Sequence, residues 1–392
     1  MAPIYPTAAA RTLDPAQLRA TFDAVAPLTI GLEEEAMLLE PGTLALLPRA
    51  AEVIERCGGD PRFKLEMPAA QLEIVLPPFA SVAECGAALG AARSDLAGAA
   101  DGIGVLAAAG AHPLGPALGR LNGGERYEGI AREYGVIAEM QQVGALQVHV
   151  AIAGHERALA VYNALRSHLP EIAALAANAP NYAGRDTGLA SVRPKLCDVL
   201  PRQGVPPVIQ SWDAFVDALR WGFEAGALPT TGRWWWELRP HLTHGTLELR
   251  VPDAQATVED AVAVAAFAHS LAAWLAERHD CGDLAPPDAT WRIEQNRWSA
   301  CRHGLDGQLA DLRSGALMPA RELLAQRLDA LAPTAAALGA TAGLEGARRL
   351  LRANGAERQR RAAAAGGGAR AAVEWLVGAY AVAAADDGPV ER

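Results

Sequence analysis

Glutamate side chains alternate with aliphatic ones in a short segment near the start of the chain. Between Ile30 and Leu38 a two-residue period places Glu33 and Glu35 on one face of a strand and the aliphatic side chains on the other. Two like charges side by side on an otherwise apolar strand cost free energy unless a cation, a basic side chain or water compensates. The pair therefore indicates either a metal site or a solvated edge strand.

The same alternation recurs in later segments, and this recurrence favours the first interpretation. The further ionisable and amide residues on this face are Glu73 in residues 71–76, Gln147 and His149 in residues 146–152, Glu237 and Arg239 in residues 235–239, and Glu248 and Arg250 in residues 246–251. Together these segments predict one sheet with an aliphatic back and an ionisable front face. A solvated front would carry Thr, Lys, Ser and mixed charge, whereas glutamates gathered with a histidine and arginines are typical of a functional site.

Glu34 is the exception to the alternation. It lies between Glu33 and Glu35 and therefore points to the aliphatic back of the predicted sheet. A carboxylate buried there needs a positive partner.

The chemistry of the front face is that of an oxygen-rich metal site. Carboxylates on neighbouring strands with one imidazole suit Mg²⁺ or Mn²⁺, whereas Zn²⁺ prefers more His or Cys. Such ions bridge nucleotide phosphates, and Arg250, two residues after Glu248, is placed to stabilise charge that develops in phosphoryl transfer. A salt bridge from Arg250 to one of the glutamates is the alternative.

The amino-acid composition favours a globular protein and argues against two functional classes, nucleic-acid binders and P-loop proteins. The 392 residues are 51% hydrophobic and 20% charged, a globular profile for two or three domains or one elaborated enzyme domain. The net charge of -10 argues against a nucleic-acid binder. Neither of the two lysines, Lys64 and Lys195, follows a glycine, which excludes a P-loop.

Location is predicted to be cytoplasmic, without a membrane segment. The first residues lack the apolar region of a signal peptide, and the uncharged stretch from Ala261 to Ala276 is shorter than the roughly 18 residues that a membrane span needs. We interpret that stretch as a buried helix. The five cysteines are scattered and odd in number, which fits reduced thiols.

The elements that must position these residues predict an α+β fold. Strands concentrate before about residue 252, and the chain beyond Asp253 reads as helices. Two of the expected helices span residues 81–109, with Ser81 as N-cap, and residues 346–361. The low-complexity run of residues 362–368 should break the chain before a last helix.

Five ordered motifs resemble one family, the carboxylate–amine ligases of the glutamate–cysteine ligase type 2 group, between about residues 28 and 310. The motifs are Gly31-Leu-Glu-Glu-Glu35, Gln147-Val-His-Val150, Asn178-Ala-Pro180 with Gly184-Arg-Asp-Thr-Gly188, Leu238-Arg-Pro240 with Gly245-Thr-Leu-Glu-Leu-Arg250, and Glu294-Gln-Asn-Arg-Trp298. The resemblance implies a glutamine-synthetase-like catalytic domain, in which a curved, mainly antiparallel sheet has helices packed on its back and a helical C-terminal part.

The resemblance also implies an ATP-dependent ligation in which a substrate carboxylate is phosphorylated and an amine then displaces phosphate to form an amide. The acid would be glutamate and the amine cysteine, and a homo-oligomer is compatible with the sequence. Carried over residue by residue, the roles implied are metal ligation by Glu33, Glu35, Glu73, His149 and Glu248, catalysis by Arg250 and Glu248, and binding of a substrate carboxylate by Arg193 and Arg239. The two last arginines could equally pair with protein carboxylates.

Four residues depart from the usual family pattern, namely Ala151, Ala179 and the adjacent Glu237 and Leu238, and they bear on which substrates are joined. The predicted domains are an N-terminal arm of residues 1–27, a catalytic domain of residues 28–310, and a C-terminal helical extension of residues 311–392 with an acidic tail. Two other functions stay open: a phosphotransferase that uses the same metal–ATP site, and a protein that binds metal and nucleotide without turnover.

Overall fold

The computed structural model describes residues 14–228 and 234–385. Within these ranges a seven-stranded sheet has the strand order β2-β3-β1-β5-β9-β8, with β4 paired to the far end of β1. The strands are β1 (Ile30–Leu39), β2 (Phe63–Leu65), β3 (Gln71–Val75), β4 (Val105–Ala107), β5 (Leu146–Ala151), β8 (Leu238–His241) and β9 (Thr246–Leu249). The pairings are all antiparallel, so the predicted α+β class with an antiparallel sheet is confirmed.

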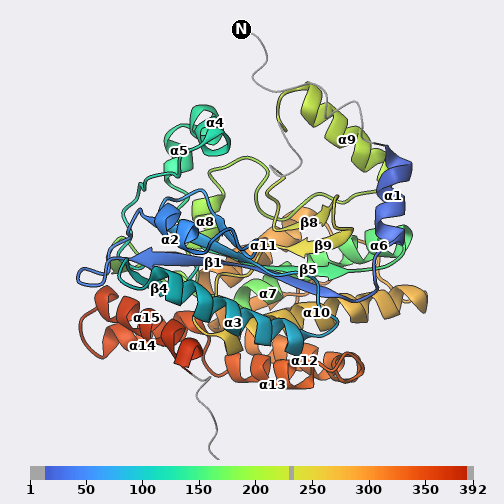
Figure 1. Ribbon diagram of the computed structural model, residues 1–392. Coiled ribbons are helices and arrows are strands. Elements are labelled where there is room, and N and C mark those ends of the chain that lie inside the picture. The colour runs from blue at the N-terminus through green and yellow to red at the C-terminus, as the bar shows by residue number, and fades with distance from the viewer. Residues whose placement is uncertain (1–13, 229–233, 386–392) are drawn as a thin grey trace, which may run out of the picture.

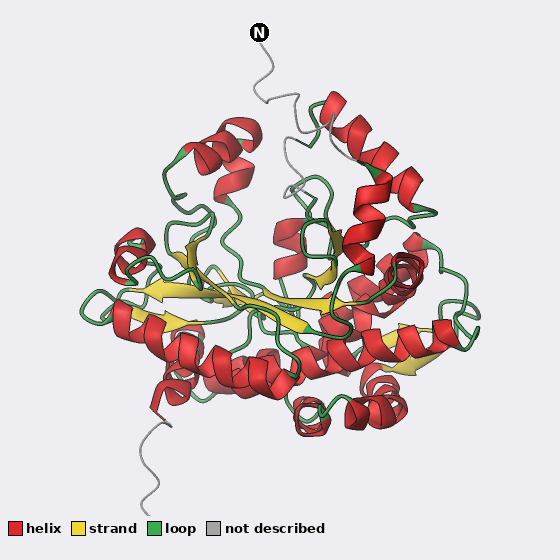
Figure 2. Ribbon diagram, turned by 45° about the vertical axis from the view of Figure 1, so that its right-hand side comes forward, coloured by secondary structure: helices red, strands yellow, loops and turns green. Residues whose placement is uncertain are grey.

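Helices cover the back of this sheet (Figure 1). The back layer consists of α3 (Val82–Ala100), α10 (Val258–Asp280), α12 (Ala320–Ala337), α13 (Thr341–Leu350), α14 (Gly355–Ala364) and α15 (Ala369–Ala385). On the other side of the sheet, α1 (Pro15–Asp23), α4 (Glu125–Tyr134), α5 (Val136–Glu139) and α9 (Trp212–Glu224) stand above its rim. The same layers are visible after a 45° turn (Figure 2). Helices therefore stand above the front face on two sides of the sheet.

Shorter elements connect the two layers. They are α2 (Ala50–Arg56), α6 (His155–Leu165), a 3₁₀ turn (Arg166–His168), α7 (Leu169–Leu175), the β6–β7 pair (Asn181–Tyr182 and Arg185–Asp186), α8 (Arg193–Cys197), α11 (Thr290–His303), a second 3₁₀ turn (Gly304–Asp306) and the β10–β11 hairpin (Gln308–Ala310 and Leu317–Pro319). Apart from that small hairpin, the described chain beyond Asp253 is helical, as the sequence predicts.

Helix α10 is the central helix of the back layer. In the described part of the chain it is the one helix long and apolar enough to cross a membrane, yet 78% of its most apolar window is buried inside the protein. It packs against α3, α6, α13 and β5. Its apolar composition therefore fits the predicted buried helix.

A buried ion pair anchors β1 to this layer. Glu34 and Arg93 of α3 are both fully buried, and the Arg93 guanidinium donates from Nε and Nη2 to the two Glu34 carboxylate oxygens at 2.7 and 2.6 Å. Arg93 also donates to the carbonyl of Gln255 and stacks on the Tyr380 ring. The positive partner predicted for Glu34 is therefore present.

Two predicted helices are shorter in the structure. The helix expected over residues 81–109 is capped by Ser81 but ends at Ala100. Gly102 then turns with a φ of +68°, and β4 follows beside β1, where a Cβ on Gly104 would lie 2.7 Å from the Leu39 carbonyl oxygen. Alanine content alone predicts a continuous helix, whereas Gly102 allows a turn and Gly104 allows a close approach of two strands.

The helix expected over residues 346–361 is two helices. α13 ends at Leu350, and α14 begins at Gly355 with Asn354 as N-cap. The Asn354 side-chain amide also donates to the Ala174 carbonyl at 3.0 Å, so the break docks on α7. The predicted boundaries at residues 27 and 310 stay predictions, and residues 1–13 of the arm and 386–392 of the acidic tail lie outside the described residues.

Candidate active site

Strand register brings the predicted ionisable residues together on the front face. Glu35 lies opposite Glu73 across the β1–β3 pair, and His149 lies opposite Glu248 across the β5–β9 pair. Arg239 of β8 then lies opposite Glu248 on its other side. Because side chains that face each other across paired strands share one face, five strands contribute to a single site.

The front-face acids form two groups. The first, cluster A, consists of Glu33, His149 and Glu248, each of which offers one ligand atom within 4.8 Å of the others. His149 Nε2 lies 3.3 Å from a Glu33 carboxylate oxygen but makes no hydrogen bond to any described residue. Its other nitrogen lies 3.0 Å from the Thr246 hydroxyl, which orients the ring. A buried, oriented imidazole nitrogen beside a carboxylate is what a metal ligand requires.

The second group, cluster B, consists of Glu35, Glu66 and Glu73, whose ligand atoms also lie within 4.8 Å of one another. Glu66 follows β2 directly, and sequence reasoning missed it because a three-residue strand shows little periodicity. The signal was present, however. Lys64 pairs with Glu73 across β2 and β3, so that Lys64 and Glu66 continue the alternation of the front face.

Burial raises the pKa values of the three carboxyl groups of cluster B. Burial and the negative charge of Glu66 raise the pKa of Glu35 to about 7. Burial and the three neighbouring glutamates raise the pKa of Glu73 well above its usual value. Burial likewise raises the pKa of Glu66. Three carboxyl groups that resist ionising together are a site that a divalent cation would complete, since its charge offsets theirs.

Glu248 has the opposite environment. Burial alone would raise its pKa, but the positive charges of Arg239 and Arg250 hold the pKa far below its usual range. Arg239 Nε and Arg250 Nη1 each donate to a Glu248 carboxylate oxygen at 2.5 Å. Arg250 also donates to the side-chain oxygen of Gln147. The salt bridge that was one alternative for Arg250 is thus formed.

The two arginines predicted to hold a substrate carboxylate lie in different places. Arg193, at the start of α8, donates to the carbonyls of Arg250 and Val251 at 2.8 and 3.1 Å and lines a cavity next to cluster B. Arg239 is bonded to Glu248 and to the Trp234 carbonyl, and it does not line that cavity. Arg193 therefore lines the cavity beside cluster B, whereas Arg239 lies against Glu248 of cluster A.

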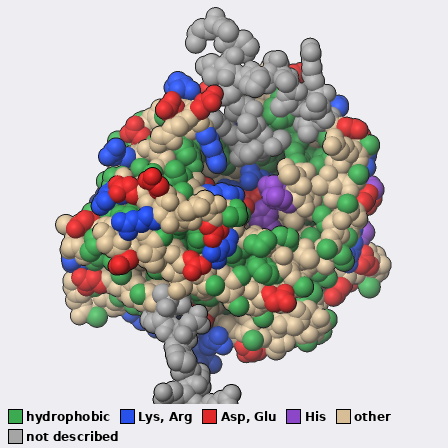
Figure 3. Space-filling view, viewed as in Figure 1, with side chains coloured by type: hydrophobic (Ala, Val, Ile, Leu, Met, Phe, Trp, Pro, Cys, Tyr) green, Lys and Arg blue, Asp and Glu red, His purple; other side chains and the backbone are tan. Residues whose placement is uncertain are grey.

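Two cavities border the clusters from different sides. The small cavity, of about 110 Å³, is lined by Glu35 and Glu66 of cluster B together with Arg193, Glu237 and Arg250. The large cavity, of about 700 Å³, is lined by Glu33 and His149 of cluster A and by Lys64, His244 and the segment Val75–Ala80. In Figure 3, histidine side chains gather beside acidic and basic ones at the centre of this face.

Lys64 was not singled out from the sequence as a functional residue. Its place on β2, opposite Glu73, brings an ammonium group to the wall of the large cavity next to cluster A. The alternation of residues 63–66 is the signal that could have found it. His244 was also missed, because it lies in the turn between β8 and β9, where no strand period applies.

Comparisons with known proteins agree on one family. The model of glutamate–cysteine ligase family 2 matches residues 29–379. A Rubrobacter xylanophilus protein provisionally named glutamate–cysteine ligase 2-3 is 40% identical over 366 residues, which cover 92% of this chain and 99% of that protein. A Thermobifida fusca protein provisionally named glutamate–cysteine ligase 2 is 30% identical over 325 residues, which cover 81% of this chain and 82% of that protein.

Solved structures show the same fold at low identity. The crystal structure of glutamate–cysteine ligase from Francisella tularensis in complex with AMP matches with a TM-score of 0.69 and 11% identity, covering 92% of this chain and 90% of that one. A bifunctional glutathione synthetase from Pasteurella multocida matches with a TM-score of 0.64 and 16% identity, covering 94% of this chain and 54% of that one. The resemblance predicted from the five motifs is confirmed, and the chain belongs to glutamate–cysteine ligase family 2.

Proposed function

We propose that this enzyme is an ATP- and divalent-metal-dependent ligase that joins the side-chain carboxylate of glutamate to the amine of cysteine through an acyl phosphate. The observation that carries the proposal is the position of clusters A and B, side by side on one sheet face and between two cavities. Family membership supports ATP-dependent ligation. A ligase of this kind must hold a nucleotide and an acid on opposite sides of the phosphate that moves.

We assign the large cavity to the nucleotide and the small cavity to the acid. The large cavity has room for a base and ribose, an apolar wall from Val75 to Ala80, and Lys64 for phosphate oxygens. The small cavity offers Arg193 and Arg250 as cationic groups for a carboxylate. Cluster A faces the first cavity and cluster B the second, so the γ-phosphate would lie between them.

The donor set of the clusters fits Mg²⁺ or Mn²⁺. Five carboxylates and one imidazole nitrogen are the oxygen-rich ligands that these ions take, and His149 Nε2 lacks a hydrogen-bond partner among the described residues. Glu33, His149 and Glu248 would hold one ion, and Glu35, Glu66 and Glu73 another. When bound, such ions supply positive charge that neutralises phosphate oxygens.

Arg250 is the residue we assign to charge stabilisation in the phosphoryl transfer. Its guanidinium is fixed by Glu248 and Gln147 and lines the small cavity. A carboxylate oxygen of the acid attacks the γ-phosphorus of ATP, and the bond to the ADP oxygen breaks. The amine nitrogen then attacks the acyl carbon, loses a proton and expels phosphate. A preorganised guanidinium stabilises the charge that shifts in both steps.

The test is the dependence of ADP release on both substrates. With Mg²⁺, glutamate and cysteine all present, we expect ADP release and a product whose mass is that of the two amino acids minus water. Omission of cysteine should stop ADP release after the acyl phosphate forms. Steady ADP release without the amine, or a stable phosphorylated acid as the product, would contradict ligation.

Two variants connect this activity to the clusters. Glu33→Gln and Glu248→Gln should each lower kcat by roughly a hundredfold or more, since each removes a charged group from cluster A. Glu55→Gln, on the exposed surface of α2, is the control and should retain full activity. Circular dichroism must show that the folds persist. A near-normal kcat in both the Glu33→Gln and Glu248→Gln variants would show that cluster A does not take part in the reaction.

A further inference from the structure

Helix α14 of the back layer reaches the loop that begins at Asn178 and carries one of the five motifs. Gln359 of α14 is fully buried there, and its Nε2 donates to both the backbone and the side-chain oxygen of Asn178, each at 2.8 Å. Gln359 Oε1 has no hydrogen-bond partner among the described residues. A buried unpaired oxygen costs free energy, and a methionine would fill nearly the same space without this cost. The contact with Asn178 therefore indicates what Gln359 does.

The backbone of α14 packs directly on the same motif residue. A Cβ on Gly355 would lie 2.2 Å from Asn178 Oδ1, and the amide of Ala356 donates to the Ala177 carbonyl at 2.9 Å. Asn178 is itself fully buried. Helix α14 and the start of this loop therefore form one packed unit.

Asn178 in turn holds the chain that leaves strand β9. Its backbone amide donates to Asp253 Oδ2 at 2.7 Å, and its side-chain Nδ2 donates to the Ala254 carbonyl at 2.8 Å. Gln255 Nε2 donates back to the carbonyl of Ala176 at 2.8 Å. Three hydrogen bonds among buried residues thus join the loop to the chain directly after the strand that carries Glu248.

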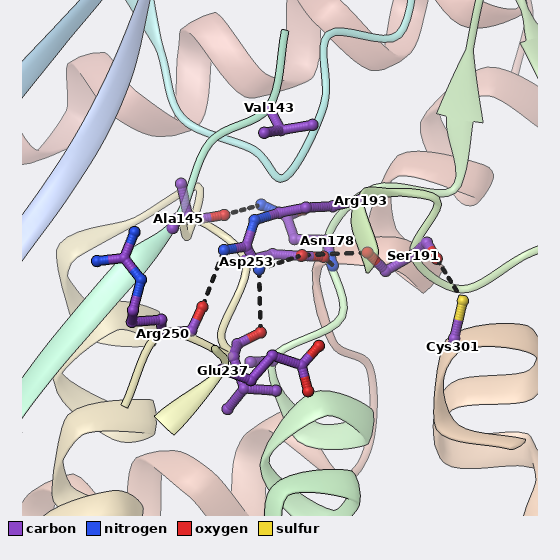
Figure 4. Close-up of polar contacts among 12 residues, drawn as sticks. Val143, Ala145, Asn178, Ser191, Arg193, Glu237, Arg250, Asp253 and Cys301 are labelled. Atoms are coloured by element: carbon purple, nitrogen blue, oxygen red, sulfur yellow. Dashed lines mark hydrogen bonds and ion pairs between the residues drawn. The ribbon is translucent and has the colours of Figure 1, made fainter. Parts of the chain in front are cut away.

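Arg193 extends this connection to Arg250. Asp253 Oδ1 lies 3.7 Å from Arg193 Nη1, and the terminal nitrogens of Arg193 donate to the carbonyls of Val251 and Arg250 at 3.1 and 2.8 Å (Figure 4). A continuous chain of contacts therefore runs from Gln359 in the back layer to the backbone of Arg250 on the front face.

We propose that Gln359 is a positioning residue for the phosphoryl transfer. It acts through this chain of contacts on the backbone of Arg250, and so on the place of the guanidinium. The inference rests on the proposed function, because that function assigns Arg250 to charge stabilisation. A displacement of about 1 Å caused far from the reacting atoms can lower a rate by roughly a hundredfold. The helical C-terminal part thus serves the reaction, although none of its described residues lines either cavity.

The first test is a double-mutant cycle. Gln359→Met keeps the size of the side chain and removes both donated bonds, and it should lower kcat by roughly tenfold with the KM for ATP nearly unchanged. In an Arg250→Lys background the same change should cost less than about twofold, since lysine presents a point charge on a flexible stem rather than a fixed fork. Equal losses in both backgrounds, as expected of a purely structural role, would overturn the inference.

Asp253→Asn tests the same chain of contacts at a second position. It keeps the side-chain volume and weakens the acceptor for Asn178, so kcat should again fall by roughly tenfold. The double variant with Gln359→Met should lose little more than either single variant, because both act on one path. Fully additive losses would show independent effects and would overturn the inference. This variant also keeps the test open if Gln359→Met does not fold.

Arg360→Gln is the matched control on the same helix. Arg360 follows Gln359 directly and donates to the Asp186 carboxylate at 2.8 and 2.9 Å and to the Leu189 carbonyl at 2.8 Å. These partners belong to the same loop but lie outside the chain of contacts to Arg250. Its kcat should stay within about twofold of wild type. Equal losses in the two variants would mean that only the docking of α14 matters.

Hydrogen exchange separates this inference from the proposed function. Gln359→Met should speed amide exchange in a peptide spanning residues 250–256, whereas Arg360→Gln should speed it only in one spanning residues 184–189. Unchanged exchange over residues 250–256 in Gln359→Met would overturn the inference even if kcat fell. If wild type forms no amide from glutamate and cysteine, the proposed function fails, and the exchange pattern still decides whether Gln359 fixes the backbone at Arg250.

Discussion

At the scale of single residues, the front face holds glutamates in two contrasting states. The pKa of Glu248 is far below its usual range because two arginines outweigh its burial, whereas the pKa of Glu35 is about 7 because burial and Glu66 act together. At the proposed metal sites, Glu248 is therefore ionised before a cation arrives, whereas Glu35 and Glu73 would lose protons as a cation binds. The two sites should differ in metal affinity.

Glu66 provides the residue-scale prediction. Glu66→Gln should raise the Mg²⁺ concentration for half-maximal activity by roughly tenfold or more, since one of three anionic ligands in cluster B becomes neutral. The measurement is a Mg²⁺ titration of ADP release at saturating ATP and substrates. Glu128→Gln, exposed on α4, is the control. An unchanged titration in Glu66→Gln would show that Glu66 is not a ligand.

How much of the site the sequence can predict follows from these residues. Alternation within a strand is enough to place Glu33, Glu35, Glu73, His149 and Glu248 on one face. The division into two clusters depends on which strands pair and in which register, and a single strand does not carry that information. Glu66 lies beyond a strand that is too short to show a period. Glu237 lies just before β8, and its contact with Arg297 depends on the tertiary structure rather than on a local sequence pattern.

At the scale of elements, alanine-rich segments are the main source of error in the predicted helix boundaries. The run from Ser81 to Ala109 reads as one helix because alanine favours helices, yet the structure ends the helix at Ala100 and pairs residues 105–107 with β1. Tertiary pairing decides between helix and strand where propensity is uniform. The sheet and its helical back were predictable because their apolar periods are long.

The β1–α3 contact carries the element-scale prediction. Arg93→Met leaves Glu34 buried without its cation, and the loss of one partner of a buried pair costs about 3 to 5 kcal/mol of unfolding free energy. Urea unfolding should show a lower midpoint with an unchanged slope. The double variant Glu34→Met with Arg93→Met should recover most of that loss, since no unpaired charge remains. A single variant as stable as wild type would mean that Glu34 is neutralised in another way.

At the scale of the whole molecule, charged contacts join the back layer to the connecting helices. Glu171 of α7 is 5% exposed and accepts from Arg327 of α12 at 2.9 Å and pairs with His168 at 2.8 Å. Burial would raise the pKa of Glu171, but His168 and Arg327 outweigh it and lower the pKa to about 2. The bridge therefore favours the ionised carboxylate in the folded state.

The pH dependence of stability follows from this lowered pKa. An unfolded glutamate has a pKa of about 4.3, so the stabilising contribution of Glu171 is fully present above that value and is lost as the pH falls towards 2. The difference corresponds to about 3 kcal/mol. Urea unfolding of wild type and Glu171→Gln at pH 6, 4 and 3 should show the two curves converging as the pH falls. Curves that stay parallel would contradict this linkage.

The buried Glu34–Arg93 pair also has a consequence for how β1 finds its place. Three consecutive glutamates could in principle pair one residue out of step, and such a slip would turn Glu33 and Glu35 into the helical layer and leave Glu34 alone on the front face. Only the native alignment pairs the carboxylate of Glu34 with the guanidinium of Arg93 and leaves Glu33 and Glu35 facing the cavities. The ion pair thus fixes the register in which β1 pairs with its neighbours. Inserting or deleting one residue in β1 should exchange the side chains on the two faces of the strand.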